Sequence, residues 1–116
     1  MSHIARTFFT IPVAIVTNTC DSPAIDMGFF EKAIIEMPAT WTTADIGVKV
    51  ATPASPAFVP LMNASFLVRV LNPYPSRAYA LPIDIAAARL IKLYSCSETG
   101  AVNQAADAAI IVTVKS

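Results

Sequence analysis

The sequence predicts a single all-β domain, an antiparallel β-sandwich or jelly roll with at most one short helix. Of its 116 residues 55% are apolar and only 14% are charged, and the apolar residues fall in short, mostly alternating runs. These runs are bounded at nearly regular intervals by Pro, Asn, Asp, Ser or Gly, which is typical of a sandwich or barrel. A chain of this length buries about two thirds of its unfolded surface, so it needs no disulfide or metal to fold.

We expect one continuous domain, with an N-terminal strand or arm in residues 1–17 and the body of the sandwich in residues 18–116. Phe8 to Thr17 is rich in β-branched and aromatic residues. Pro12 within it cannot donate a hydrogen bond to a ladder, so this strand is expected at a sheet edge. Residues 18–28 have the composition of a loop.

Three further strands are expected in the middle of the chain. The first is Ala33 to Met37, which Pro38 stops. In the second, Ile46, Val48 and Val50 alternate with Gly47, Lys49 and Ala51, which predicts a strand with one face in the core. The third is Phe66 to Leu71, ending at Asn72. Residues 57–62 form a short strand at most, and the proline-rich residues 73–76 form a loop.

The last third of the chain contains the one expected helix and two late strands. Residues 81–88 carry Pro82, which a first helical turn tolerates, and three consecutive alanines, so one or two turns of helix are expected. Leu90 to Ser95 and Ala109 to Lys115 alternate as strands do, and the polar residues 97–104 link them.

Residues that could support catalysis or bind a metal are scarce. His3 lies near the chain end, where a triad base would not be held rigidly, and Cys20 and Cys96 are expected to be unpaired thiols in a reducing compartment. No spacing selects a carboxylate pair or a set of zinc ligands. The sequence therefore predicts no catalytic residues, no metal site and no cofactor. Residues 6–20 could also be interpreted as a signal peptide, but Pro12 inside the apolar run favours a strand.

Charge and composition point to protein partners. Eight Lys and Arg balance eight Asp and Glu without a basic run, so nucleic acid and anionic membranes are not expected partners. No stretch approaches the roughly 20 apolar residues that cross a bilayer. A neutral, ion-poor exterior is typical of a protein that neighbouring molecules cover, so we expect an assembly subunit.

Aromatic residues supply the candidate interface. Adjacent strand residues face opposite sides of a sheet, so one member of each phenylalanine pair, 8–9 and 29–30, needs a partner beyond the core. Trp41 is expected in the core, with stacking on a sugar ring as the alternative. The expected interface residues are Phe8, Phe9, Ile11, Phe29, Phe30, Trp41 and Phe58.

Three segments resemble a family of small tailed-bacteriophage virion proteins. They are Ile35-Glu36-Met37-Pro38-Ala39-Thr40-Trp41-Thr42, Arg77-Ala78-Tyr79-Ala80-Leu81-Pro82 and Val102-Asn103-Gln104-Ala105-Ala106-Asp107. The likeness spans about residues 26–115. The family's Gly/Asp-rich hairpin is replaced here by residues 51–58, which leaves the role of that loop open.

The resemblance implies a β-sandwich that is a structural part of the virion. The function expected from it is a non-enzymatic capsid decoration, or cement, protein on the capsid surface, assembled in the host cytoplasm. Its expected partners are the major capsid protein and further copies of itself, in a trimer. Two alternatives remain open: a glycan-binding module that uses Trp41, Tyr74 or Tyr79, and a head–tail or tail subunit.

Overall fold

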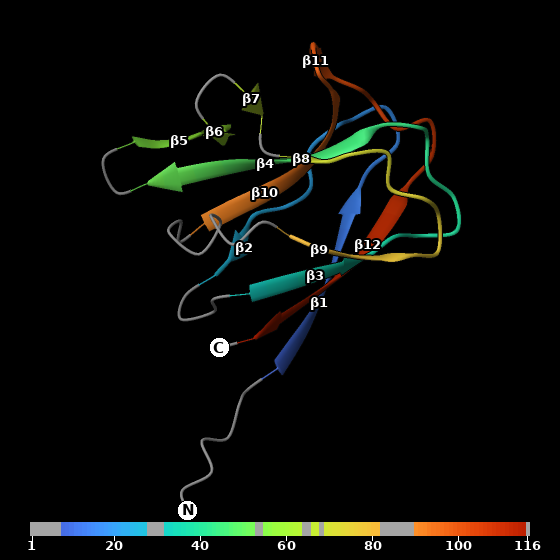
Figure 1. Ribbon diagram of the computed structural model, residues 1–116, viewed down its shortest axis with the longest axis horizontal. Helices are drawn as coiled ribbons and strands as arrows, with labels where there is room; N and C mark the ends of the chain where they lie inside the picture. The colour runs from blue at the N-terminus through green and yellow to red at the C-terminus, as the bar shows by residue number, and fades with distance from the viewer. Residues whose placement is uncertain are drawn as a thin grey trace, which may run out of the picture.

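Two antiparallel sheets face each other in this protein and form a β-sandwich (Figure 1). The computed structural model describes residues 8–27, 32–52, 55–63, 66–67, 69–81 and 90–115. Within these residues the chain is all-β, which confirms the fold class that the sequence predicts. The same residues contain no helix long and apolar enough to cross a membrane.

The four-stranded sheet joins the two ends of the described chain. Its order is β1-β12-β3-β9, with β1 at Phe8–Ile15, β12 at Ala108–Lys115, β3 at Lys32–Glu36 and β9 at Ala78–Ala80. β1 pairs with β12 along its whole length, from Phe8 opposite Lys115 to Ile15 opposite Ala108. β1 is an edge strand, which confirms the position that Pro12 predicts.

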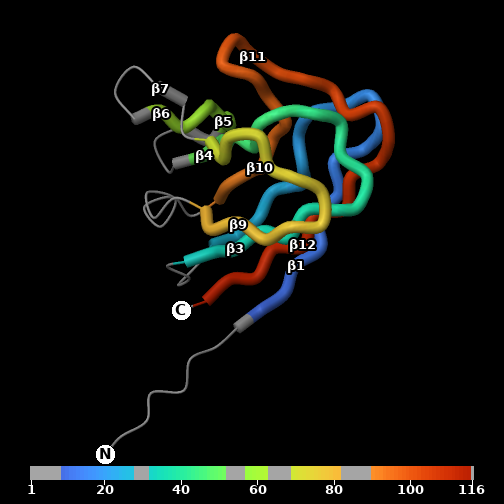
Figure 2. Tube along the Cα trace, turned by 45° about the vertical axis from the view of Figure 1, so that its right-hand side comes forward, coloured from blue at the N-terminus to red at the C-terminus, as the bar shows by residue number. Residues whose placement is uncertain are grey.

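The six-stranded sheet is centred on β4 and β10. β4 has β5 and β8 on one side and β10 on the other, and β10 also pairs with β2 and β11. A separate hairpin, β6 with β7, lies near β5 and away from β1 and β12 (Figure 2). The bounds are β2 Ile25–Asp26, β4 Asp45–Thr52, β5 Ser55–Pro60, β6 Met62–Asn63, β7 Phe66–Leu67, β8 Arg69–Val70, β10 Leu90–Ser97 and β11 Gly100–Ala101.

Alternation along the strands builds the core between the sheets. Strand residues two apart share a face, so each strand contributes every second side chain to the interior. Ile35 and Ile110 of the four-stranded sheet are fully buried, as are Ile46 and Leu93 of the six-stranded sheet. Packing them away from water is the main term that stabilises this fold.

The second face of β4 is also covered, although the alternation of the strand suggests only one buried face. Gly47 and Ala51 are buried as well as Ile46, Val48 and Val50. The ring of Tyr94, on the neighbouring strand β10, lies against Gly47, where a Cβ would stand 2.5 Å from the Tyr94 Cε1. Glycine is therefore required here by the close approach of an aromatic ring.

Three short strands are unexpected: β2 and β11 lie in segments expected to be loops, and β9 lies in a segment for which no strand is expected. β2, β9 and β11 each contain only two or three residues, and each pairs with a longer strand. The expected strand at residues 66–71 is divided into β7 and β8, and Val68 lies outside the described residues. The expected helix at residues 81–88 also lies outside them, except for Leu81, which is buried and donates its N–H to Ala33 O at 2.9 Å.

The three segments that carry the phage resemblance contact one another. Met37 N donates to Arg77 O at 2.8 Å, and Ser76 N donates to Pro38 O at 3.2 Å. Thr42 N donates to the side chain of Gln104 at 2.9 Å. These hydrogen bonds therefore connect loops that lie far apart in sequence.

Candidate interaction surface

The surface of the four-stranded sheet that points away from the core is mostly neutral, and its charged residues lie towards the two ends of β3. Because Ala33, Ile35, Val112 and Val114 are buried, the alternating residues of β3 and β12 face outward. We call this surface the outer face. Its exposed or half-exposed neutral residues are Thr10, Pro12, Ala14, Ile34, Ala78, Ala80, Ala109, Ile111 and Thr113. Its charged residues are Lys32, Glu36 and Lys115.

The charges of the outer face follow the strand register. Lys32 lies opposite Lys115, Ile34 lies opposite Thr113, and Glu36 lies opposite Ile111. Positive charge therefore gathers at one end of β3 and negative charge at the other, with Ile34 midway. The Ile34 side chain is 48% exposed, a large fraction for an isoleucine in a paired strand.

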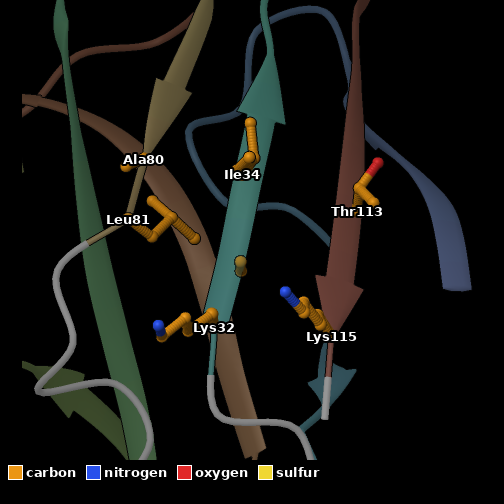
Figure 3. Close-up of a pocket in the computed structure, with 7 residues that line it drawn as sticks. Lys32, Ile34, Ala80, Leu81, Thr113 and Lys115 are labelled. Atoms are coloured by element: carbon orange, nitrogen blue, oxygen red, sulfur yellow. The ribbon is translucent and has the colours of Figure 1, made fainter. Parts of the chain in front are cut away.

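A hollow of about 440 Å³ lies at the lysine end of β3 (Figure 3). Its volume lies within the range of pockets that accept small ligands or side chains. Its described walls are mostly apolar, and Figure 3 shows the lysines at one end of the hollow and Ile34 with Thr113 at the other. The lining residues are Lys32, Ala33, Ile34, Ala80, Leu81, Thr113 and Lys115.

Of the expected interface residues, Phe9 is the one exposed on β1. It lies opposite Val114, on the core-facing side of the strand, yet is 52% exposed. Ile11 is half-buried and packs against the core. The side chain of Phe8 lies outside the described part of the chain, as do Phe29 and Phe30.

Trp41 is partly buried and packs against the core, as the sequence predicts. Its indole Nε1 donates to Ala44 O at 3.2 Å, so the polar edge of the ring is occupied within its own loop. Phe58 lies on β5 of the other sheet, with its ring centroid 4.6 Å from the Lys92 Nζ. The described members of the expected interface therefore do not form one patch.

The residues of the outer face were not singled out by the sequence reasoning, although a signal for them exists. In the sequence, Lys32 and Glu36 each lie two residues from Ile34, and the structure buries Ala33 and Ile35 between them. Alternation along a strand places Ile34 between Lys32 and Glu36 on an outward face. The pairing of β3 with β12, which brings Lys115 beside Lys32, is evident only from the tertiary structure.

Several ionisable groups of the six-stranded sheet and of the loop beside it lie in ion pairs or against an aromatic ring. On β4 and β10, the Lys49 Nζ lies 2.8 Å from the Asp21 Oδ1 and 4.9 Å from the centroid of the Tyr94 ring. Burial raises the pKa of Tyr94 to about 12, so its hydroxyl stays protonated at neutral pH. Beside them, Arg69 Nη1 lies 3.3 Å from Asp45 Oδ2. This arrangement stabilises the covered side of the sheet.

Neither cysteine is in a disulfide, which confirms the expected free thiols. Burial raises the pKa of both, and the Asp21 carboxylate, 3.4 Å from the Cys20 Sγ, adds to the effect at Cys20. Neutral thiols that are buried, as at Cys96, or half-buried, as at Cys20, are poor nucleophiles. No group of three or more His, Cys, Asp or Glu side chains able to hold a metal occurs in the described ranges.

Comparison with known proteins reveals a shared fold. No protein-family model matches the sequence, and no curated protein does so. Among solved structures, the fold is similar to the crystal structure of the SPBc2 prophage-derived protein YomS. The TM-score is 0.66 at 10% sequence identity, and the match covers 100% of this chain and 99% of YomS. The chain therefore has the same β-sandwich fold as YomS.

Proposed function

We propose that this protein is a non-enzymatic structural subunit of a bacteriophage particle, and specifically a capsid decoration protein. In this role it binds the major capsid protein on the virion surface, associates with further copies of itself, and is assembled in the host cytoplasm. The observation that carries the proposal is the outer face, where mostly neutral side chains cover four paired strands and the charged residues are Lys32, Glu36 and Lys115. Such a surface suits burial against another protein, because little charge must be desolvated.

Two further observations support the proposal. The fold is similar to that of a prophage-derived protein, which favours a phage origin. The ionisable groups near the two cysteines are engaged in ion pairs and aromatic contacts, which favours a structural over a catalytic role.

β1 is the proposed contact with the capsid. It is an edge strand, and an edge offers unpaired main-chain groups to a neighbouring chain. Phe9 adds a large apolar side chain that is half-exposed at one end of this strand. Deletion of residues 1–17 would be a poor test, because Val13 and Ile15 belong to the core.

Point substitutions test this contact in the folded protein. Phe9→Ser and Val16→Ser are matched, since the side chains are 52% and 54% exposed in the free chain. We expect Phe9→Ser to weaken cosedimentation with capsids that lack the protein, and Val16→Ser to leave it unchanged. Equal binding by both variants would contradict the role of β1.

The stoichiometry in purified virions tests the function itself. A decoration protein is expected in copy numbers comparable to the major capsid protein, and adding it should raise the temperature at which capsids break open. Quantitative mass spectrometry of virions measures the ratio. A count of a few copies per particle would instead indicate a head–tail or tail subunit.

A glycan-binding module is the second candidate, and one exposed aromatic residue favours it. Tyr74 is 69% exposed, and its backbone N donates to the Tyr79 Oη at 2.9 Å, which places the two residues together. Exposed aromatic rings are typical platforms for sugars. Binding on a glycan array that is lost in Tyr74→Ala would support this candidate over decoration.

A further inference from the structure

We infer that the outer face pairs with the outer face of a second copy about a two-fold axis that passes near Ile34, with Lys32 of each copy against Glu36 of the other. This inference rests on the self-association in the proposed function and gives it a two-fold form, in place of the trimer that the phage resemblance implies. The geometry that leads to it is the order of charges along β3, positive at Lys32, neutral at Ile34 and negative at Glu36.

The two charges are placed symmetrically about Ile34. Each lies two residues from it, or about 6–7 Å along the strand, on the same side of the sheet. Consider a two-fold axis that lies between the two outer faces, perpendicular to the strands and level with Ile34. It makes the two β3 strands run in opposite directions and sets each Lys32 over Glu36 of the second copy. Isologous interfaces of this kind are the commonest in soluble oligomers. An axis parallel to the strands would instead set like charges against each other.

The polar partners are available for such a contact. Lys32 and Glu36 are both exposed, and neither forms an ion pair with any residue in the described part of the chain. The charges thus favour one orientation of the pair and oppose the reversed one.

The neutral residues permit close stacking. Thr113 and Ala80 flank Ile34 across the sheet, and small side chains let two sheets approach to about 10 Å. Four strands about 4.8 Å apart, with outward residues about 6.6 Å apart, present only a few hundred Å² per copy. This is less than the roughly 800 Å² per partner of a stable complex, so we expect a weak pair. Multiple attachment on a particle would strengthen it.

Charge reversal on the full chain tests the pairing by sedimentation equilibrium. We expect the unmodified protein to be a monomer in equilibrium with a dimer, with weaker association in 0.5 M salt. Lys32→Glu and Glu36→Lys alone should each weaken dimerisation by about tenfold or more, because each turns two attractive contacts into repulsive ones. The double variant K32E/E36K keeps the net charge of the natural chain and should restore it.

Two further variants separate the interface from the fold and from general charge effects. Glu98→Lys changes the net charge as Glu36→Lys does, but at the exposed tip between β10 and β11, and should leave the dimer intact. Ile34→Asp should abolish the dimer while the circular dichroism spectrum and melting temperature show a folded chain.

The inference is overturned if the natural chain is a monomer at all concentrations, or if it is a trimer. It is also overturned if the natural chain forms a dimer that Glu36→Lys does not weaken, or if the double variant fails to dimerise. Failure here with a capsid-like copy number in virions would leave the proposed function standing.

Discussion

The carboxamide of Gln104 hydrogen-bonds to both backbone groups of Thr42. Its Oε1 accepts from Thr42 N at 2.9 Å, and its Nε2 donates to Thr42 O at 3.1 Å. The Gln104 backbone in turn accepts from Asn18 N and donates to Thr19 O, so one fully buried residue joins three loops. A side chain here replaces the main-chain partner that a neighbouring strand would supply.

Gln104→Ala is expected to lower the free energy of unfolding by about 1–3 kcal/mol, because the Thr42 N–H and C=O lose their partners in a partly buried site. Chemical denaturation measures the change. Gln104→Met keeps most of the side-chain volume and controls for packing. If the methionine variant is as stable as the natural protein, the hydrogen bonds contribute little.

Gln104→Glu should make stability depend on pH. A carboxyl in this site can replace both hydrogen bonds only when protonated, and burial favours the neutral form, which raises its pKa in the folded state. With a higher pKa in the folded than in the unfolded state, the introduced carboxyl keeps its proton to a higher pH when the variant is folded. The variant should therefore lose stability, relative to the natural protein, as the pH rises through the folded-state pKa. Denaturant midpoints of both proteins measure the difference. They are taken from pH 4, near the ordinary Glu pKa of about 4.3, up to about pH 8. A pH-independent difference would contradict this account.

Gly47→Ala should destabilise the sandwich by about 1–3 kcal/mol through overpacking. The added Cβ would lie 2.5 Å from Tyr94 Cε1 and 2.7 Å from its Cζ, so the ring must move. In a Tyr94→Ala background the same substitution should cost much less. A double-mutant cycle measures this coupling, and additive effects of the two substitutions would exclude it.

Asp107 is expected to contribute to acid sensitivity. Hydrogen bonds from the Thr17 N, at 2.7 Å, and the Thr17 Oγ1, at 2.8 Å, lower the pKa of its carboxyl. Because the pKa of Asp107 is lower in the folded protein than its ordinary value of 3.8, the ionised carboxylate stabilises the fold above that pH. This stability is lost as the pH falls through the folded-state pKa. Between pH 7 and about pH 2, the free energy of unfolding of Asp107→Asn should therefore fall by less than that of the natural protein. Glu98→Gln, at an exposed tip, should leave this fall unchanged. Unfolding curves from pH 7 down to about 2 measure this.

Both thiols should react slowly with a disulfide reagent while the protein is folded. Cys96 is fully buried and Cys20 is half-buried, and both have raised pKa values, so little thiolate is present at pH 8. We expect labelling roughly tenfold or more slower than in denaturant, with Cys96 slower than Cys20. Cys20→Ser isolates the buried thiol. Rapid labelling of that variant in buffer would contradict the packing around Cys96.

Much of the fold could be predicted because strand alternation is a local property. The runs that contain β1, β3, β4, β10 and β12 are evident from their apolar periodicity, and Pro12 correctly indicates an edge. The short strands β2, β9 and β11 could not be found in this way. They have two or three residues each, and they are strands only because a longer neighbour accepts and donates their backbone hydrogen bonds.

The amino-acid sequence by itself determined that this chain forms a β-sandwich and that it is poor in charged residues, because composition and strand alternation are properties of the sequence alone. Only the tertiary structure decided which residues are neighbours. It pairs β1 with β12 from opposite ends of the chain, sets Lys115 beside Lys32, and leaves Ile34 exposed between two opposite charges. The physical reason is that strand order and register depend on contacts between distant segments, and a local pattern does not specify them.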